Sequence, residues 1–133
     1  MKSKYNIFID GASRNNPGEA GIGILIKDNQ ETIKTIASYL GQTTNNVAEY
    51  MALIRGLEEA LLLKIKEVHF YSDSELLVKQ INGDYRVKNE GLKPLYIHAQ
   101  SLIAKFSSFH ITHIKRELNA EADELANLGI DNK

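Results

Sequence analysis

Residues 4–10 alternate with the period of two that is typical of a β-strand, with Tyr5, Ile7 and Ile9 on one side and Asn6, Phe8 and Asp10 on the other. Two further strands are expected over Ala20–Lys27 and Glu31–Leu40. The pair Asp10-Gly11 predicts a turn after the first segment, and Asp28-Asn29 is a good turn pair between the other two. We therefore expect three strands joined as an antiparallel meander.

A helical period begins at Asn46. Apolar side chains then recur at helical spacing, at Val47, Met51, Ile54, Leu57 and Leu61. Further along, short strands and helices alternate, and glycines mark two helix ends. The expected elements are a strand over Glu67–Ser72, a helix over Ser74–Asn82 stopped by Gly83, a helix over Leu95–Phe106, a strand over Phe109–Lys115, and a helix over Asn119–Leu128 stopped by Gly129.

This order of elements predicts an α/β fold. A meander followed by strands that alternate with helices is typical of a mixed five-stranded sheet, with three antiparallel strands, then two parallel ones, and helices on both faces. The 133 residues suit one domain, which we place at 1–133. We expect this domain to be a monomer.

The composition excludes several kinds of active site but says less about the binding partner. The chain has no cysteine, which excludes disulfides, thiolate metal sites and a cysteine nucleophile. The apolar run in residues 1–10 is too short for a signal peptide or a membrane span, so we expect a cytoplasmic protein without a membrane partner. The formal net charge of −1 argues only weakly against a nucleic-acid partner, because acids gathered in one metal site would leave the remaining surface net positive.

Four carboxylates have ordinary structural explanations when each is taken alone. Asp10 belongs to an Asp-Gly pair that is typical of turns. Glu49 stands three residues after Asn46 and so could complete a capping box. Asp73 and Asp123 lie near helix starts, where acids complement the helix dipole.

Taken together, the same four residues predict a metal site. If the fourth strand pairs in parallel with the first, Asp10 and Asp73 lie at neighbouring strand ends, where ligands of open α/β sheets collect. We expect Glu49 to point towards the sheet and Asp123 to face the same end of it. Ionised carboxylates repel one another unless cations neutralise them. Mg²⁺ prefers oxygen ligands, and two such ions suit four carboxylates and the cleavage of a phosphodiester.

Four sequence motifs also occur in one order over nearly the whole chain. They are Asp10–Gly21 (DGASRNNPGEAG), Thr43–Tyr50 (TTNNVAEY), Tyr71–Gly83 (YSDSELLVKQING) and Arg116–Leu125 (RELNAEADEL). In this combination they resemble the type 1 ribonuclease H family. The resemblance implies an endonuclease that cuts the RNA strand of RNA–DNA hybrids and leaves 5′-phosphate and 3′-hydroxyl ends. It also implies that the four carboxylates are catalytic ligands of Mg²⁺, with Mn²⁺ as an alternative, and that two ions bind with the substrate.

The resemblance further implies which residues contact the hybrid. Family loops that touch the RNA minor groove and a DNA phosphate match polar residues of this chain, namely Asn15, Asn16, Thr44, Asn45, Asn46 and Ser74. The chemistry fits, because amides can read 2′-hydroxyls and base edges while hydroxyls can hold phosphate. For the asparagines, turns and helix caps are the alternative roles.

The chain departs from longer bacterial relatives in three ways. The flexible histidine-containing loop before the last carboxylate is missing, and Arg116 or Glu117 is the candidate for assisting product release in its place. The basic protrusion is missing as well, which leaves Lys88 and Lys93 as candidate phosphate contacts. We also expect no N-terminal hybrid-binding domain.

Two other functions stay open at the level of the sequence. One is a non-catalytic nucleic-acid-binding module that shares the fold, since a fold alone does not secure an activity. The other is a different nuclease of the same superfamily, such as an exonuclease or a double-stranded-RNA nuclease. A ribonuclease H is expected to cut duplex RNA only weakly.

Overall fold

A computed structural model describes residues 4–133 of the chain. Residues 1–3, which begin the apolar run considered above as a signal peptide, lie outside the described residues. In chain order the elements are β1 (Tyr5–Arg14), β2 (Gly18–Asp28), β3 (Glu31–Thr43), α1 (Asn45–Leu62), β4 (Glu67–Ser72), α2 (Glu75–Ile81), α3 (Lys93–Ile103), β5 (Ser108–His113), the short 3₁₀ helix η1 (Arg116–Asn119) and α4 (Ala120–Asp131). No helix in the described part of the chain is long and apolar enough to cross a membrane.

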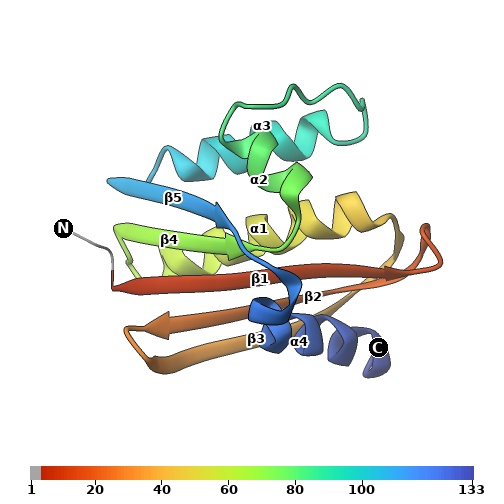
Figure 1. Cartoon of the computed structure of the whole chain (residues 1–133), viewed down its shortest axis with the longest axis horizontal. Helices are drawn as coiled ribbons and strands as arrows, with labels where there is room; N and C mark the ends of the chain where they lie inside the picture. Colours follow the sequence, from red (N-terminus) through yellow and green to blue (C-terminus); the bar gives the residue numbers. More distant parts are fainter. Residues whose placement is uncertain (1–3) are drawn as a thin grey trace.

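The strands form one five-stranded sheet in the order β3-β2-β1-β4-β5 (Figure 1). Strands β1, β2 and β3 pair antiparallel, whereas β4 pairs in parallel with both β1 and β5. The sheet is therefore the mixed sheet expected from the order of elements. Because β4 lies beside β1 rather than beside β3, the chain must cross the sheet through α1 after the meander.

Helices cover both faces of the sheet, as predicted. Helix α1 lies against β1 and β2 and is packed in turn by α2 and α3, while α4 lies against the meander (Figure 1). Adjacent residues of β2 face opposite sides of the sheet. Ile22 lies opposite Gly11, which packs against α1, and the next residue, Gly23, packs against α4. The core side chains of the α1 face are fully buried and include Ile7, Ile9, Ile24, Leu53, Leu57 and Phe70.

The pair Asp10-Gly11 is not a turn, so the predicted end of the first strand is wrong. Strand β1 continues to Arg14, and the turn into β2 lies at residues 15–17. Gly11 has a packing role instead. A Cβ atom at this position would lie 2.3 Å from the carbonyl carbon of Ala48 and 2.4 Å from the backbone nitrogen of Glu49, so glycine is what lets α1 approach the strand.

Gly129 does not end the last helix, which is a second correction. Helix α4 continues through it to Asp131. A Cβ atom at Gly129 would lie 2.6–2.8 Å from the backbone of Ser38, so the glycine allows α4 to cross β3 at close range. The remaining boundaries differ from the expected ones by a few residues, and α2 ends before Gly83 as predicted.

Candidate active site

The parallel pairing of β1 with β4 ends at the residue pair Ile9 and Ser72. Asp10 and Asp73 are the next residues of the two chains, and so they emerge side by side where the pairing stops. Strand β1 then continues to Arg14, beyond the end of β4. The sequence analysis expected two aspartates at neighbouring strand ends; what ends at Asp10 is the β4 pairing rather than the strand itself.

Glu49 reaches this place from the second turn of α1. The backbone N–H of Gly11 donates to Glu49 Oε1 at 2.6 Å, just beyond the last pair between β1 and β4. Glu49 does not form the capping box considered above, because the N-cap of α1 is Thr44, whose hydroxyl accepts from the backbone nitrogen of Val47. The glutamate therefore points towards the sheet, as predicted, and its carboxylate belongs to the site.

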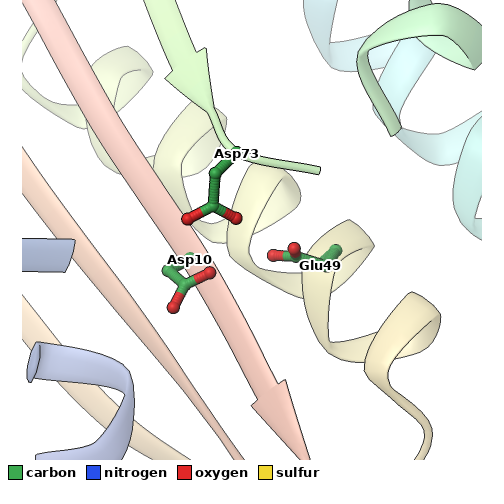
Figure 2. Close-up of side chains that lie close together, drawn as sticks. All are labelled: Asp10, Glu49 and Asp73. Atoms are coloured by element: carbon green, nitrogen blue, oxygen red, sulfur yellow. The ribbon is translucent and has the colours of Figure 1, made fainter. Parts of the chain in front are cut away.

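Asp10, Glu49 and Asp73 converge at one point (Figure 2). Each offers one carboxylate oxygen such that the three oxygens lie within 4.8 Å of one another. They line an open cavity of about 310 Å³, which Asp123 reaches from the first turn of α4. All four predicted carboxylates thus line the same cavity, although their donors come from β1, α1, the end of β4 and α4.

The protein environment disfavours negative charge on these acids. Burial, together with the neighbouring carboxylates Glu49, Asp73 and Asp123, raises the pKa of Asp10 to about 9. Burial also raises the pKa of Glu49 to about 8, although the hydrogen bond from the Gly11 backbone opposes the shift. Carboxyl groups held this close without a cation are destabilised when ionised. A divalent cation would supply the missing positive charge.

Asn119 packs behind the carboxylates and is 1% exposed. Its Nδ2 donates to the backbone carbonyl of Ile9 at 2.9 Å and to Asp73 Oδ2 at 3.3 Å. Burial raises the pKa of Asp73, and both the hydrogen bond from Asn119 and the charge of Arg116 oppose that shift. Asn119 therefore contacts the Asp73 carboxylate directly, and it also contacts Ile9, the residue before Asp10.

The fold and this cavity can be compared with known proteins. A family model described as reverse transcriptase-like matches residues 8–129. The structure superposes on the crystal structure of RNase H1 from Halobacterium salinarum with a TM-score of 0.94 at 34% identity, over 97% of this chain and 98% of that one. It superposes on LC11-RNase H1, solved in complex with an RNA/DNA hybrid, with a TM-score of 0.91 at 43% identity, over 97% and 98% of the two chains. The chain belongs to the ribonuclease H family.

Relatives within the ribonuclease H family differ in length. A bifunctional protein of Mycobacterium tuberculosis is 39% identical over 130 residues, which are 96% of this chain but 36% of that protein. The chain thus spans about a third of the length of the mycobacterial relatives that it matches.

Two of the asparagines that match ribonuclease H loops, Asn16 and Asn45, are linked by a hydrogen bond. Asn16 Oδ1 accepts from the backbone nitrogen of Asn45 at 2.9 Å, and Asn45 Oδ1 accepts from the backbone nitrogen of Ser13 at 2.8 Å. Asn45 and Asn46 line the cavity. Asn15 and Asn16 lie on the exposed turn between β1 and β2, where Asn16 contacts Asn45. Asn16 and Asn45 therefore have the structural role that was considered as the alternative. This role uses only the side-chain oxygens of the two amides.

Two hydroxyls that match the family pattern cap helices. Thr44 is the N-cap of α1, and Ser74 is the N-cap of α2, where its hydroxyl accepts from the backbone nitrogen of Leu77 at 3.2 Å. Ser74 also lines the cavity with the carboxylates. Both hydroxyls keep their own hydrogen for another acceptor, because an oxygen that accepts a hydrogen bond can also donate one.

The charged candidates lie in different places. Arg116 lines the carboxylate cavity, but Glu117 lines a separate hollow of about 200 Å³ beside Phe8 and Lys27. Lys93 is the first residue of α3 and pairs with Glu90 at 2.8 Å. Lys88 is exposed on the connection between α2 and α3. The structure does not bring Lys88 or Lys93 into the carboxylate cavity.

Gly11 and Asn119 were not assigned to the site by the sequence analysis. Gly11 was read as a turn residue, because an Asp-Gly pair carries that signal at short range. Asn119 lies one turn before Asp123, which indicates from the sequence that it could present a polar group to the same end of the sheet, but nothing in its position indicates burial or contact with Asp73. Only the tertiary arrangement places both against the carboxylates.

Proposed function

We propose that this chain is a metal-dependent endonuclease that hydrolyses the RNA strand of RNA–DNA hybrids and leaves 5′-phosphate and 3′-hydroxyl ends. The observation that carries the proposal is the convergence of three carboxylate oxygens within 4.8 Å in a cavity open to solvent. The kinship with LC11-RNase H1, solved in complex with an RNA/DNA hybrid, supports this choice of substrate. Of the alternatives, a non-catalytic module gives no reason to retain destabilising acids at one point.

The donor set fits a hard divalent cation. Asp10, Glu49, Asp73 and Asp123 offer only oxygen, which suits Mg²⁺ or Mn²⁺ rather than a metal that prefers sulfur or nitrogen. The raised pKa values of Asp10 and Glu49 are also what such a cation would reverse. We propose that two ions bind with the substrate. Ions of this kind activate a water and stabilise the leaving oxygen of a phosphodiester.

Recognition of the hybrid is assigned to the loops beside the cavity. Because the carbonyl oxygens of Asn16 and Asn45 accept from backbone N–H groups, their orientation is fixed and their amide N–H₂ groups remain as donors. Donors suit the acceptors of an RNA minor groove, including the 2′-hydroxyl. Asn15 and Asn46 extend this polar edge, and the hydroxyls of Thr44 and Ser74 are proposed as phosphate contacts.

Arg116 is the proposed contact for the phosphate being cut or released. Among the described residues that line the carboxylate cavity it is the only cation, and its charge already acts on Asp73. Glu117 faces another hollow, so the geometry favours Arg116 for product release. Lys88 and Lys93 are proposed to bind substrate phosphates at a distance from the carboxylate cavity. Lys93 would have to exchange Glu90 for phosphate, a small cost for an exposed ion pair.

The finer points of this function rest on the same reasoning. We propose a monomer that acts in the cytoplasm and cuts duplex RNA only weakly. The substrate preference follows from the asparagine donors, which read groups that DNA lacks or presents in a groove of different width.

The test is a substrate panel. Hybrid, duplex RNA and duplex DNA of one sequence, each labelled on one strand, are incubated with the protein in Mg²⁺, Mn²⁺ or EDTA. The expected result is cleavage of the RNA strand of the hybrid, much slower cleavage of duplex RNA and none of duplex DNA, with all cleavage abolished by EDTA. Equal rates on hybrid and duplex DNA would refute the substrate assignment, and equal rates with and without EDTA would refute the metal assignment.

A further inference from the structure

Asn119 connects three parts of the molecule that meet behind the carboxylates. It lies at the junction of η1 and α4, and its side chain is almost completely buried. One nitrogen, Nδ2, donates both to the carbonyl of Ile9 on β1 and to Asp73 Oδ2 beyond the end of β4. Ile9 immediately precedes Asp10. The same amide group is therefore linked to both aspartates of the site, to one directly and to the other through the backbone.

The orientation of this amide is determined by its partners. A backbone carbonyl and a carboxylate oxygen are both acceptors, so only the N–H₂ end of the side chain can face them. The opposite orientation would place Asn119 Oδ1 against two other oxygens. Nδ2 has two hydrogens and two acceptors, and both hydrogens are used.

Ordinary structural roles do not account for Asn119. It occupies the N-cap position of α4, but its side chain makes no capping hydrogen bond. Its Oδ1 is buried and has no donor among the described residues 4–133. A buried acceptor without a donor lowers the stability of a fold, so a residue that served packing alone would be apolar.

We propose, on the basis of the function proposed above, that Asn119 is a positioning residue that fixes the spacing and orientation of the Asp10 and Asp73 carboxylates for metal binding. By holding Oδ2 of Asp73, it sets the direction in which the other oxygen of that carboxylate points. By holding the Ile9 carbonyl, it keeps β1 in place where the pairing with β4 has ended. Partners behind metal ligands commonly change affinity by about 10–100-fold when removed, because they orient the ligands.

The test compares Mn²⁺ affinity, by calorimetry or by electron paramagnetic resonance of the free ion, with folding stability in EDTA. Asn119→Ala is expected to bind Mn²⁺ about 10–100-fold more weakly than the wild type. Turnover on the hybrid should fall, and the Michaelis constant should change little. Asn119→Ser is the second variant, because serine suits an N-cap and so protects folding. Its hydroxyl has one hydrogen, cannot serve both acceptors, and should lose affinity too.

The matched control is Asn82→Ala. Asn82 Nδ2 also donates to a strand carbonyl, that of Ile111 at 3.3 Å, but touches no carboxylate of the cavity. This variant should lose some stability and keep wild-type Mn²⁺ affinity. If the Asn119 variants bind Mn²⁺ within twofold of the wild type, Asn119 is a structural residue and the inference fails alone. If the wild type binds no Mn²⁺, or if Asp73→Asn does not remove the Mn²⁺ that the wild type binds, the proposed function fails together with the inference.

Discussion

The backbone N–H of Gly11 donates to Glu49 Oε1 across 2.6 Å, and this bond joins a strand to a helix 38 residues later in the chain. The contact is possible because glycine has no Cβ atom; a Cβ atom at position 11 would overlap the backbone of Ala48 and Glu49. Gly11→Ala should therefore push α1 away from β1 and move the glutamate. We expect a loss of about 1–3 kcal/mol in the free energy of unfolding, as for other overpacked sites, and a large drop in cleavage.

Urea denaturation and hybrid cleavage measure these two effects, with Gly91→Ala as the control. A Cβ atom at Gly91 would meet only the side-chain oxygen of Asn89 at 3.1 Å, a milder approach than the 2.3–2.4 Å to backbone atoms at Gly11. The control should be close to wild type in both assays. Wild-type stability and activity in Gly11→Ala would contradict the close packing of α1 on β1.

The stability of the metal-free protein should fall as the pH rises. The pKa of Asp10 is raised to about 9 and that of Glu49 to about 8 in the folded state, above their ordinary values of 3.8 and 4.5. Between the ordinary and the raised values the folded state binds more protons than the unfolded state, so raising the pH favours unfolding. Asp10→Asn removes one of these groups. The variant should gain stability over the wild type in EDTA, and the gain should be larger at pH 9 than at pH 5.

Denaturant titrations of the two proteins at both pH values give this difference directly. Shifts at groups away from Asp10 cancel in the comparison, including the lowered pKa of Glu59, which is held down first by Lys34. A stability difference that is the same at pH 5 and pH 9 would show that burial and the neighbouring carboxylates do not raise the pKa of Asp10 as described. Saturating Mg²⁺ should stabilise the wild type and do less for the variant.

Arg116 should matter for turnover and Glu117 should not. Arg116 lines the carboxylate cavity, whereas Glu117 lines another hollow. Removing a cation that stabilises charge on a reacting phosphate commonly costs on the order of 100-fold in turnover. We expect a loss of that order in Arg116→Ala and near wild-type rates in Glu117→Gln, measured as steady-state cleavage of the hybrid. Equal losses in the two variants would contradict the assignment.

The amide donors of Asn16 and Asn45 should set affinity for the hybrid. Asn16→Asp and Asn45→Asp keep the oxygens that accept from the backbone but remove the N–H₂ groups. The Michaelis constant should rise roughly tenfold per variant, about 1.4 kcal/mol, with a smaller change in turnover. Asn29→Asp adds the same charge at the turn between β2 and β3 and is the control. If it weakens binding equally, net charge rather than the lost donor explains the effect.

Much of the fold was predictable because period and turn chemistry are local signals. The alternation of residues 4–10, the turn pair Asp28-Asn29 and the helical spacing after Asn46 identified elements, and the order of the elements identified the mixed sheet. Local signals failed where a glycine is required by close packing against a segment that is distant in the sequence. Gly11 resembles a turn residue and Gly129 a helix stop, yet both are determined by backbones that pack against them, those of α1 and β3.

The four carboxylates were predictable for a different reason. Their motifs occur in family order, and parallel pairing of β1 with β4 brings Asp10 and Asp73 together. The role of Asn119 could not be derived in this way. Its burial and its bond to Asp73 depend on how η1 lies against β1 at the point where the pairing with β4 ends, which no local pattern encodes.

The most direct test of the central claim is the turnover of Asp10→Asn on an RNA–DNA hybrid in Mg²⁺. The variant is expected to be at least as stable in EDTA as the wild type is, so it is folded without metal and a loss of activity cannot be attributed to unfolding. If Asp10, Glu49 and Asp73 together hold the ions that cleavage requires, turnover should fall by at least about 1000-fold, which is roughly 4 kcal/mol in the barrier. Turnover above about one-tenth of the wild-type value, a cost below roughly 1.4 kcal/mol, would contradict the account.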